Sequence, residues 1–190
     1  MTQPGESDES LMQRFAGGEV AAFDALYRRH EQRTWRYLLR NLGDRAQADE
    51  LMQEVWFAVA REAARYRPTA RFTTWLFTLA RNRLVDALRS RRRQVSLEVL
   101  EAGGAPLPEP LVTEPSVGPL AATVARDQAG ALARALVQLP AEQRDAFLLH
   151  AEGELSVEEV AAVTGSSFET TKSRLRYARG KLRELLSEYA

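Results

Sequence analysis

The sequence predicts an all-α protein with two small helical domains joined by a flexible linker. Apolar residues recur three and four positions apart through both halves of the chain, which is the spacing of one helix face. No strand-like alternation or hairpin dipeptide competes in the first half. A stretch rich in proline and glycine, residues 101–119, separates the halves. We therefore expect one domain over residues 1–93, a linker over 94–126 and a second domain over 127–190.

Four helices are expected in the first domain, over residues 7–16, 19–42, 44–66 and 72–92. Ser7 can cap the first helix, and Gly43 can end the second. Pro68 stops the third helix, because proline disrupts a helix interior, and this leaves a loop over residues 67–71.

The second domain is expected to begin with a helix from about Asp127 to Leu139 and another over residues 141–151. Pro140 suits the start of the later helix, because its missing amide would have no helical partner there. The preceding linker carries apolar residues such as Leu107 and Leu111 as well as proline and glycine. Docking of the linker into a groove therefore remains open beside an extended, freely moving chain.

The stretch over residues 156–183 has the pattern of a short helix, a tight turn and a longer basic helix. Two capping boxes mark the helix starts: Ser156 with Glu159, and Ser166 with Glu169. Gly165 can supply the left-handed backbone conformation that closes the first helix. We predict a helix-turn-helix over residues 156–179, a motif whose ligand is the DNA major groove. The alternative is an ordinary pair of helices in a small bundle.

Composition argues against several classes of protein. The chain has 190 residues and no cysteine, so it has neither disulfides nor thiolate metal sites. The N-terminus lacks the apolar core of a signal peptide, and no apolar run approaches the roughly 20 residues of a membrane helix. We expect a cytoplasmic protein without membrane insertion, metal or cofactor. His30 and His150 lie in unrelated helical contexts, and no nucleophile has an evident base, which argues against an enzyme.

The charges are segregated along the chain, although 26 basic and 26 acidic residues give a net charge of zero. One basic segment runs from Arg65 to Arg93 with Asp86 as its single acidic residue. A second runs from Phe168 to Arg183 with Glu169 alone. Residues 94–125 between them contain glutamates and no basic residue. Two basic patches on separate domains suggest two contacts with a phosphate backbone.

The third expected helix carries an acidic face. Two pairs lie four residues apart and share that face: Asp49 with Gln53, and Glu50 with Glu54. An exposed Trp56 or Phe57 would make the surface partly aromatic, which suits a basic protein partner better than DNA. The alternative is that acidic residues early in the helix only complement its dipole.

The fourth expected helix begins with aromatic residues and ends in a run of arginines at residues 89–93. Aromatic rings beside arginines suit the capture of unstacked bases along a phosphate track. The spacing of Phe72, Trp75 and Leu79 points to one face, however, and favours core positions for these residues. The arginines and Asn82 are therefore the better candidates for DNA contact.

Taken in order, the segments are Asp49-Glu-Leu-Met-Gln-Glu-Val55, Phe72-Thr-Thr-Trp-Leu-Phe-Thr-Leu-Ala-Arg-Asn-Arg-Leu-Val-Asp-Ala-Leu-Arg89 with its arginine run, Leu139-Pro-Ala-Glu-Gln-Arg144 and the helix-turn-helix. This order resembles the extracytoplasmic-function (ECF) group of bacterial sigma factors. The resemblance covers almost the whole chain, with a sigma2-like domain at about Ser7–Arg93 and a sigma4-like domain at about Asp127–Tyr189. The combination is specific, although each piece alone is not.

The resemblance implies a promoter-specificity subunit that binds core RNA polymerase and promoter DNA and is usually held inactive by an anti-sigma factor. The acidic helix would dock on the clamp coiled coil of the largest polymerase subunit through Asp49, Glu50, Gln53 and Glu54. The −10 element would be bound by Arg65, Arg67, Arg71, Asn82, Arg83, Arg89, Arg91, Arg92 and Arg93. The loop over residues 65–71 and the helix around Asn82 would capture an extruded base, and the arginine run would hold the adjacent backbone. The −35 element would be read in the major groove by Lys172, Ser173, Arg174 and Arg176. The linker would thread toward the RNA-exit path.

Two positions depart from the family pattern. Phe168 opens the recognition helix where members often carry an aliphatic residue, and Tyr177 stands where many have a basic residue. Both leave the −35 sequence open. A helix-turn-helix regulator acting without polymerase would explain the second domain, but it would leave the acidic helix and the first basic patch unassigned.

Overall fold

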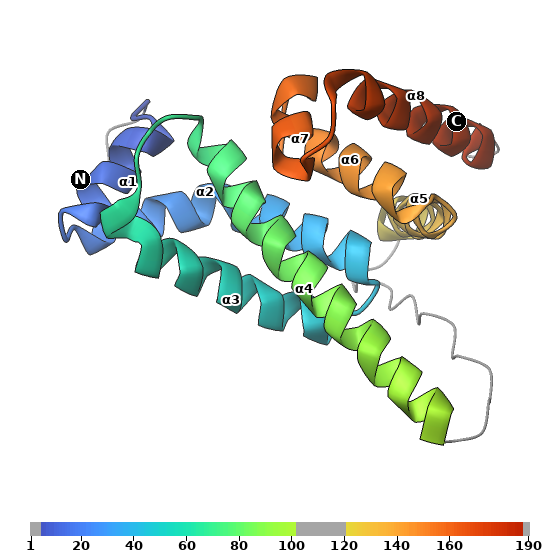
Figure 1. Ribbon diagram of the computed structural model, residues 1–190. Coiled ribbons are helices and arrows are strands. Elements are labelled where there is room, and N and C mark those ends of the chain that lie inside the picture. Colours follow the sequence, from blue (N-terminus) through green and yellow to red (C-terminus); the bar gives the residue numbers. More distant parts are fainter. Residues whose placement is uncertain (1–4, 102–120, 188–190) are drawn as a thin grey trace.

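The computed structural model describes residues 5–101 and 121–187, and all regular structure in these ranges is helical. The elements are α1 (Asp8–Ala16), α2 (Val20–Leu42), α3 (Arg45–Glu62), the 3-10 turn η1 (Ala63–Arg65), α4 (Phe72–Glu101), α5 (Ala121–Val137), α6 (Ala141–Ala151), α7 (Val157–Thr164) and α8 (Phe168–Leu185). The all-α prediction is confirmed. Figure 1 shows α1–α4 as one bundle, the N-terminal module, and α5–α8 beside it as the C-terminal module.

The N-terminal module is built around α2, which packs against α1, α3 and α4. Leu26, Leu38 and Val55 are fully buried between these helices, together with Phe72 and Leu76 of α4. Burial of each such side chain contributes about 1.5–3 kcal/mol. The helical spacing that the sequence shows is therefore the spacing of one shared core.

The predicted caps at Ser7 and Gly43 are present, and Asp44 caps the third helix as well. The Ser7 hydroxyl accepts a hydrogen bond from the Ser10 amide at 3.2 Å, and Asp44 accepts one from the Gln47 amide at 3.1 Å. Gly43 ends α2 with a φ of 70°, a left-handed conformation that glycine adopts at little cost.

Three predicted helix ends were wrong. α3 ends at Glu62 and passes into η1, because Tyr66 leaves the helix with extended backbone angles to pack its ring 5.1 Å from that of Trp75. α4 continues past Arg92 to Glu101, and α5 begins at Ala121 instead of near Asp127. Residues 93–101 contain neither glycine nor proline, so nothing in them breaks a helix. Residues 102–120 of the predicted linker lie outside the described residues.

The C-terminal module packs α6, α7 and α5 against α8. α6 spans residues 141–151 as predicted. The capping box at Ser156 and Glu159 is present, and Gly165 closes α7 with a φ of 65°. The second predicted capping box was wrong. The cap of α8 is Ser167, whose hydroxyl accepts from the Thr170 amide at 3.2 Å, because the helix begins one residue later than that pattern requires.

Candidate protein-binding and nucleic-acid interfaces

The acidic face of α3 lies on the surface of the N-terminal module. The four residues predicted to bind a protein partner are all exposed: Asp49, Glu50, Gln53 and Glu54. Asp49 accepts a hydrogen bond from the Trp35 indole at 2.6 Å and lies 3.9 Å from the Arg45 guanidinium. Asp49 is thus held in place by α2 and by its own helix, while its neighbours are free to meet a partner.

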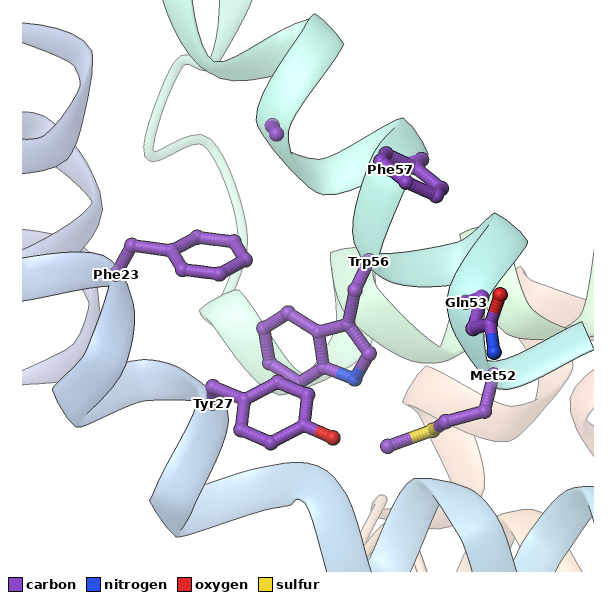
Figure 2. Close-up of a pocket in the computed structure, with 7 residues that line it drawn as sticks. Phe23, Tyr27, Met52, Gln53, Trp56 and Phe57 are labelled. Carbon is purple, nitrogen blue, oxygen red and sulfur yellow. The ribbon is translucent and has the colours of Figure 1, made fainter. Parts of the chain in front are cut away.

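An apolar groove of about 420 Å³ continues this face between α2 and α3. Figure 2 shows its lining: Phe23 and Tyr27 from α2, and Met52, Gln53, Trp56, Phe57 and Ala60 from α3. Phe57 is 73% exposed, whereas Trp56 is only 5% exposed. Of the two aromatic residues that the sequence offered for this surface, Phe57 is therefore the accessible one.

The contribution of α2 to this groove was missed by the sequence reasoning. Phe23 and Tyr27 have the spacing of core residues, and both do pack against Trp56, with ring centroids 5.6 and 5.0 Å apart. Apolar residues at helical spacing show which face of a helix is apolar, but they do not show that part of this face remains exposed to solvent. The exposed Phe57 within an acidic helix was the available signal.

The residues predicted to bind the −10 element lie on η1, the following loop and α4. Arg65, Asn82, Arg89, Arg91 and Arg93 are exposed, Arg83 is half-buried, and the side chain of Arg92 lies outside the described part. Asn82, Arg89 and Arg93 share one face of α4 and span roughly 17 Å at about 1.5 Å per residue, whereas Arg91 lies on the opposite face. A span of that length suits several successive backbone phosphates.

Two loop arginines already have partners within the protein. Arg67 donates to the Tyr66 carbonyl at 3.0 Å, and Arg71 lies 3.4 Å from the Glu159 carboxylate of α7. Thr74 donates to the same carboxylate at 2.6 Å. Burial alone would raise the pKa of Glu159, but its hydrogen bonds with Thr74 and the Ser156 amide, and the charge of Arg71, together hold that pKa below its usual range. The C-terminal module therefore covers part of this predicted DNA surface.

The aromatic residues at the start of α4 are core residues, as their spacing predicted. Phe72 and Phe77 are fully buried, and Trp75 and Leu79 are half-buried. The Phe72 amide donates to the Glu9 carboxylate at 2.7 Å, so α1 fixes the first turn of α4. A carboxylate also complements the dipole at that helix end.

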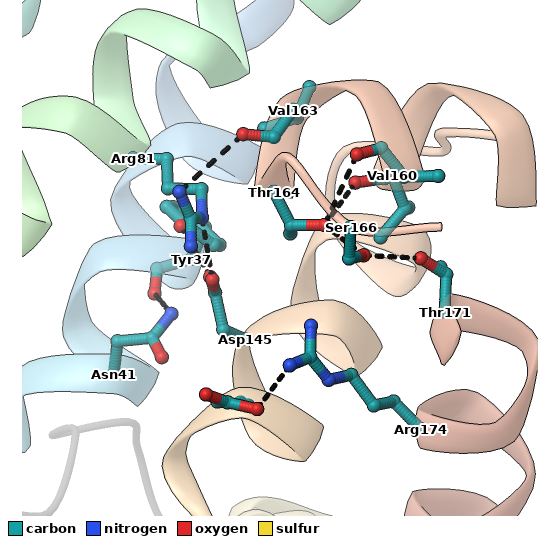
Figure 3. Close-up of polar contacts among 12 residues, drawn as sticks. Tyr37, Asn41, Arg81, Asp145, Val160, Val163, Thr164, Ser166, Thr171 and Arg174 are labelled. Carbon is teal, nitrogen blue, oxygen red and sulfur yellow. Dashed lines mark hydrogen bonds and ion pairs between the residues drawn. The ribbon is translucent and has the colours of Figure 1, made fainter. Parts of the chain in front are cut away.

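The predicted recognition helix, α8, buries one face and presents another. Thr171, Leu175, Ala178 and Leu182 are buried, whereas Lys172 and Arg176 are exposed and Ser173 is half-buried. Arg174, the fourth residue predicted to read DNA, instead pairs with Glu142 of α6, and its side chain is 23% exposed. The structure therefore brings Lys172, Ser173 and Arg176 together on the open side. It turns Arg174 toward its own module (Figure 3).

The two residues that depart from the family pattern lie on the open part of α8. Phe168 and Tyr177 are both exposed. The Lys172 ammonium lies 6.0 Å from the centre of the Phe168 ring, and the Arg176 guanidinium lies 5.0 Å from that of Tyr177. Each ring can therefore orient a neighbouring cation through a cation–π contact.

The turn between α7 and α8 is held by a chain of hydroxyl groups. Ser166 Oγ lies 2.8 Å from the Thr164 hydroxyl and 2.7 Å from the Thr171 hydroxyl (Figure 3). Ser166 thus has a structural role in the turn, although it does not cap α8. The fixed angle between the two helices allows α8 to enter a groove as a rigid unit.

Within the described residues, no group of three or more histidine, aspartate or glutamate side chains could hold a metal ion. His30 bonds to Asp8 at 2.7 Å, and His150 bonds to the Leu155 carbonyl at 2.7 Å. In the same part of the chain, no helix combines the length and apolar character needed to cross a membrane.

Comparison with known proteins places this architecture in the sigma-70 class. The family described as Sigma-70 region 2 matches residues 26–94, and Sigma-70, region 4 matches residues 129–182. The chain is 36% identical over 180 residues to RNA polymerase sigma factor CarQ of Myxococcus xanthus, covering 93% of this chain and 96% of CarQ. It is 34% identical to the ECF sigma factor RpoE of Cereibacter sphaeroides, covering 89% and 88% of the two chains.

Solved structures agree with this placement. The sigma factor RpoE in a co-crystal with the anti-sigma factor NepR from Bartonella quintana is similar at a TM-score of 0.70 and 25% identity, over 87% of this chain and 96% of that one. CnrH in complex with the cytosolic domain of CnrY shares the fold at a TM-score of 0.68 and 24% identity, over 97% and 100% of the two chains. The protein belongs to the ECF group of the sigma-70 family and is a sigma factor that directs transcription.

Proposed function

We propose that the two modules divide the work of promoter recognition. The acidic face of α3 and its groove bind core RNA polymerase, the loop after η1 and α4 bind the −10 element and help to melt it, and α8 reads the −35 element. The corresponding domains are residues 1–93 and 127–190. The protein acts as a regulatory subunit without enzymatic activity or cofactor, in the cytoplasm.

The polymerase-binding role is supported above all by the junction of the acidic face with the apolar groove. Gln53 belongs to both surfaces, and the exposed Phe57 stands beside it. Interfaces are commonly anchored by an aromatic residue in a central apolar contact, surrounded by a polar rim. Asp49, Glu50 and Glu54 supply an acidic rim, which suits a helical partner with apolar and basic residues.

The DNA-binding roles are supported by exposed basic side chains on both modules. Asn82, Arg89, Arg91 and Arg93 follow one helix in the first, and Lys172 and Arg176 stand on the open side of a helix-turn-helix in the second. Lysine and arginine pair well with guanine edges and with phosphates. A regulator that ignores polymerase would have no use for the α3 groove, so that alternative is not favoured.

An anti-sigma factor is the expected regulator. RpoE of Bartonella quintana was solved with the anti-sigma factor NepR, and CnrH was solved with the cytosolic domain of CnrY. We infer that this chain has a partner of the same kind, which would hide surfaces needed for polymerase or DNA.

Reconstitution with core RNA polymerase on a promoter library tests the proposal. We expect core-dependent initiation from a defined set of sequences. Charge reversal by Asp49→Arg with Gln53→Arg should weaken core binding and leave DNA binding by the C-terminal module intact. Failure to bind core or to initiate from any sequence would overturn the proposal, and equal loss of both activities in the variant would overturn the role given to α3.

A further inference from the structure

The seam between the modules contains arginines to which none of these roles assigns a ligand. Arg33, Arg36 and Arg40 are spaced three and four residues apart, so they share one face of α2. Arg81 of α4 points into the same seam. We call these four residues the seam arginines. Their side chains are partly exposed, so each guanidinium reaches the boundary between the modules.

Each seam arginine is held by a carboxylate of the C-terminal module. Arg36 Nε donates to Glu152 at 2.7 Å, and Arg40 bonds to the other oxygen of the same carboxylate. The other two seam arginines also have carboxylate partners. Arg81 Nε donates to Asp145 at 2.7 Å, and Arg33 pairs with Glu154 at 2.8 Å. The side chains of Glu152 and Asp145 are only 6% and 14% exposed. Glu152 and Asp145 are thus seated between the modules, whereas Glu154 lies at the exposed edge of the seam.

A surface that seats carboxylates in this way has the chemistry of a phosphate site. The guanidinium group offers a planar fork of donors that fits carboxylate and phosphate oxygens alike. Glu152 accepts from two different arginines, as a backbone phosphate commonly does. The seam arginines therefore suit the backbone of nucleic acid whenever the C-terminal module moves away.

The position of the seam arginines supports DNA as that ligand. Arg81 directly precedes Asn82, and on the same helix Thr74 is bonded to Glu159. The carboxylates of α6 and α7 therefore cover the side of α2 and α4 at which the proposed −10 surface begins. A duplex that entered along α4 would meet these arginines next.

We call the arrangement in which the two modules pack together the closed protein. This arrangement cannot persist on a promoter. Elements near −10 and −35 are about 25 base pairs apart, which is roughly 85 Å of duplex at about 3.4 Å per pair. In the closed protein α7, which precedes the recognition helix, packs directly on α4 (Figure 1). The modules must separate before each can reach its own element, and separation releases the seam arginines.

We propose that the seam arginines are a second binding surface for the phosphate backbone of duplex DNA, occupied by Asp145, Glu152 and Glu154 in the closed protein. Closure and duplex binding then compete for the same guanidinium groups. This proposal deepens the DNA-binding role of the N-terminal module and rests on it. It gives a chemical role to the ion pairs between the modules, because these pairs can be exchanged for pairs with phosphate.

The test uses the full-length chain and a fluorescent random-sequence DNA duplex, without polymerase. Because the sequence has no cysteine, Ala64→Cys and Gly180→Cys provide unique labelling sites for energy transfer between the modules. Ala64 is exposed, and an added side chain at Gly180 meets no atom within 4 Å. Duplex titrated into the labelled protein should lower the transfer efficiency as it binds. Unchanged transfer at saturation would refute the competition.

A second measurement isolates the arginines. Asp145→Asn with Glu152→Gln should open the seam and strengthen duplex binding. Adding Arg36→Gln and Arg40→Gln to that opened protein should weaken binding and reduce the salt dependence of log K by about 1.8, at roughly 0.9 for each lost phosphate contact. Arg61→Gln is the matched control, because Arg61 pairs with Glu62 of its own helix and not with a carboxylate of the C-terminal module, so the salt dependence should stay unchanged.

The outcomes separate the proposal from a purely structural seam. Equal duplex affinity and salt dependence with and without Arg36 and Arg40 in the opened protein would overturn the proposal. Core polymerase binding is measured on the same variants and should be retained, since the seam lies away from the α3 groove. If the wild-type chain did not bind core polymerase at all, the polymerase-binding role of the N-terminal module would be refuted instead.

Discussion

Replacing Phe57 with alanine should weaken polymerase binding without weakening the fold. Phe57 is 73% exposed in the free protein, so little of its packing contributes to folding. A phenylalanine side chain buries roughly 200 Å² when fully covered. Docking into a partner would therefore remove about 145 Å² more from water, worth about 3.6 kcal/mol at about 25 cal/mol per Å².

Alanine retains part of that area, so the expected loss is about 2–3 kcal/mol, or roughly 30- to 150-fold in Kd. Competition binding of labelled protein to core polymerase measures the affinity, and urea unfolding measures the stability. The free energy of unfolding should change by no more than about 0.5 kcal/mol, as is usual for surface positions.

Val20→Ala is the control for Phe57→Ala. Val20 is 67% exposed on α2, but it does not line the groove. Its substitution should leave the affinity for polymerase unchanged. An unchanged Kd for Phe57→Ala would refute the argument that the groove anchors polymerase, as would a loss of affinity matched by a loss of stability.

The other predictions concern the C-terminal module. Ser156→Ala removes the cap of α7 and should lower the free energy of unfolding by about 1 kcal/mol in urea titrations. Because folding lowers the pKa of Glu159, its carboxylate stabilises the fold above the usual glutamate pKa and loses this effect as the pH falls through the folded-state pKa. The stability difference between wild type and Glu159→Gln should therefore shrink on acidification, and a pH-independent difference would contradict this. Arg176→Gln should reduce the salt dependence of DNA binding by about 1, whereas an unchanged slope would place Arg176 away from phosphate.

Local patterns predicted the helices and most of their ends, because caps and glycine conformations act over a few residues. Ser7, Asp44 and Ser156 cap helices as their positions require. The prediction of a second capping box was wrong because Ser166 and Ser167 both offer a hydroxyl, and the local sequence does not decide which of the two caps α8. The hydroxyl chain through Thr171 uses Ser166 and leaves Ser167 for the helix.

The surfaces were harder to predict than the helices, because they depend on contacts between distant parts of the chain. Arg174 has the sequence context of a DNA-reading residue, yet Glu142 lies close enough in the fold to pair with it. The pairing of Tyr37 with Asp145 spans 108 residues and joins separate modules. Charge composition marks such residues as polar, but it carries no information about which opposite charges meet.

The composition of the seam bears on how the protein can work. Phe77 of α4 lies close to Gly153, where an added Cβ would approach its ring to 3.3 Å, so apolar packing does cross the seam. Ion pairs and hydrogen bonds cross the seam as well, including that of Arg81 with Asp145 (Figure 3). Opening an apolar interface would cost about 25 cal/mol for each Å² exposed, whereas ion pairs can be replaced by pairs with phosphate. Once both modules are bound to one polymerase, each also raises the effective concentration of the other at the promoter, so neither DNA contact has to be strong alone.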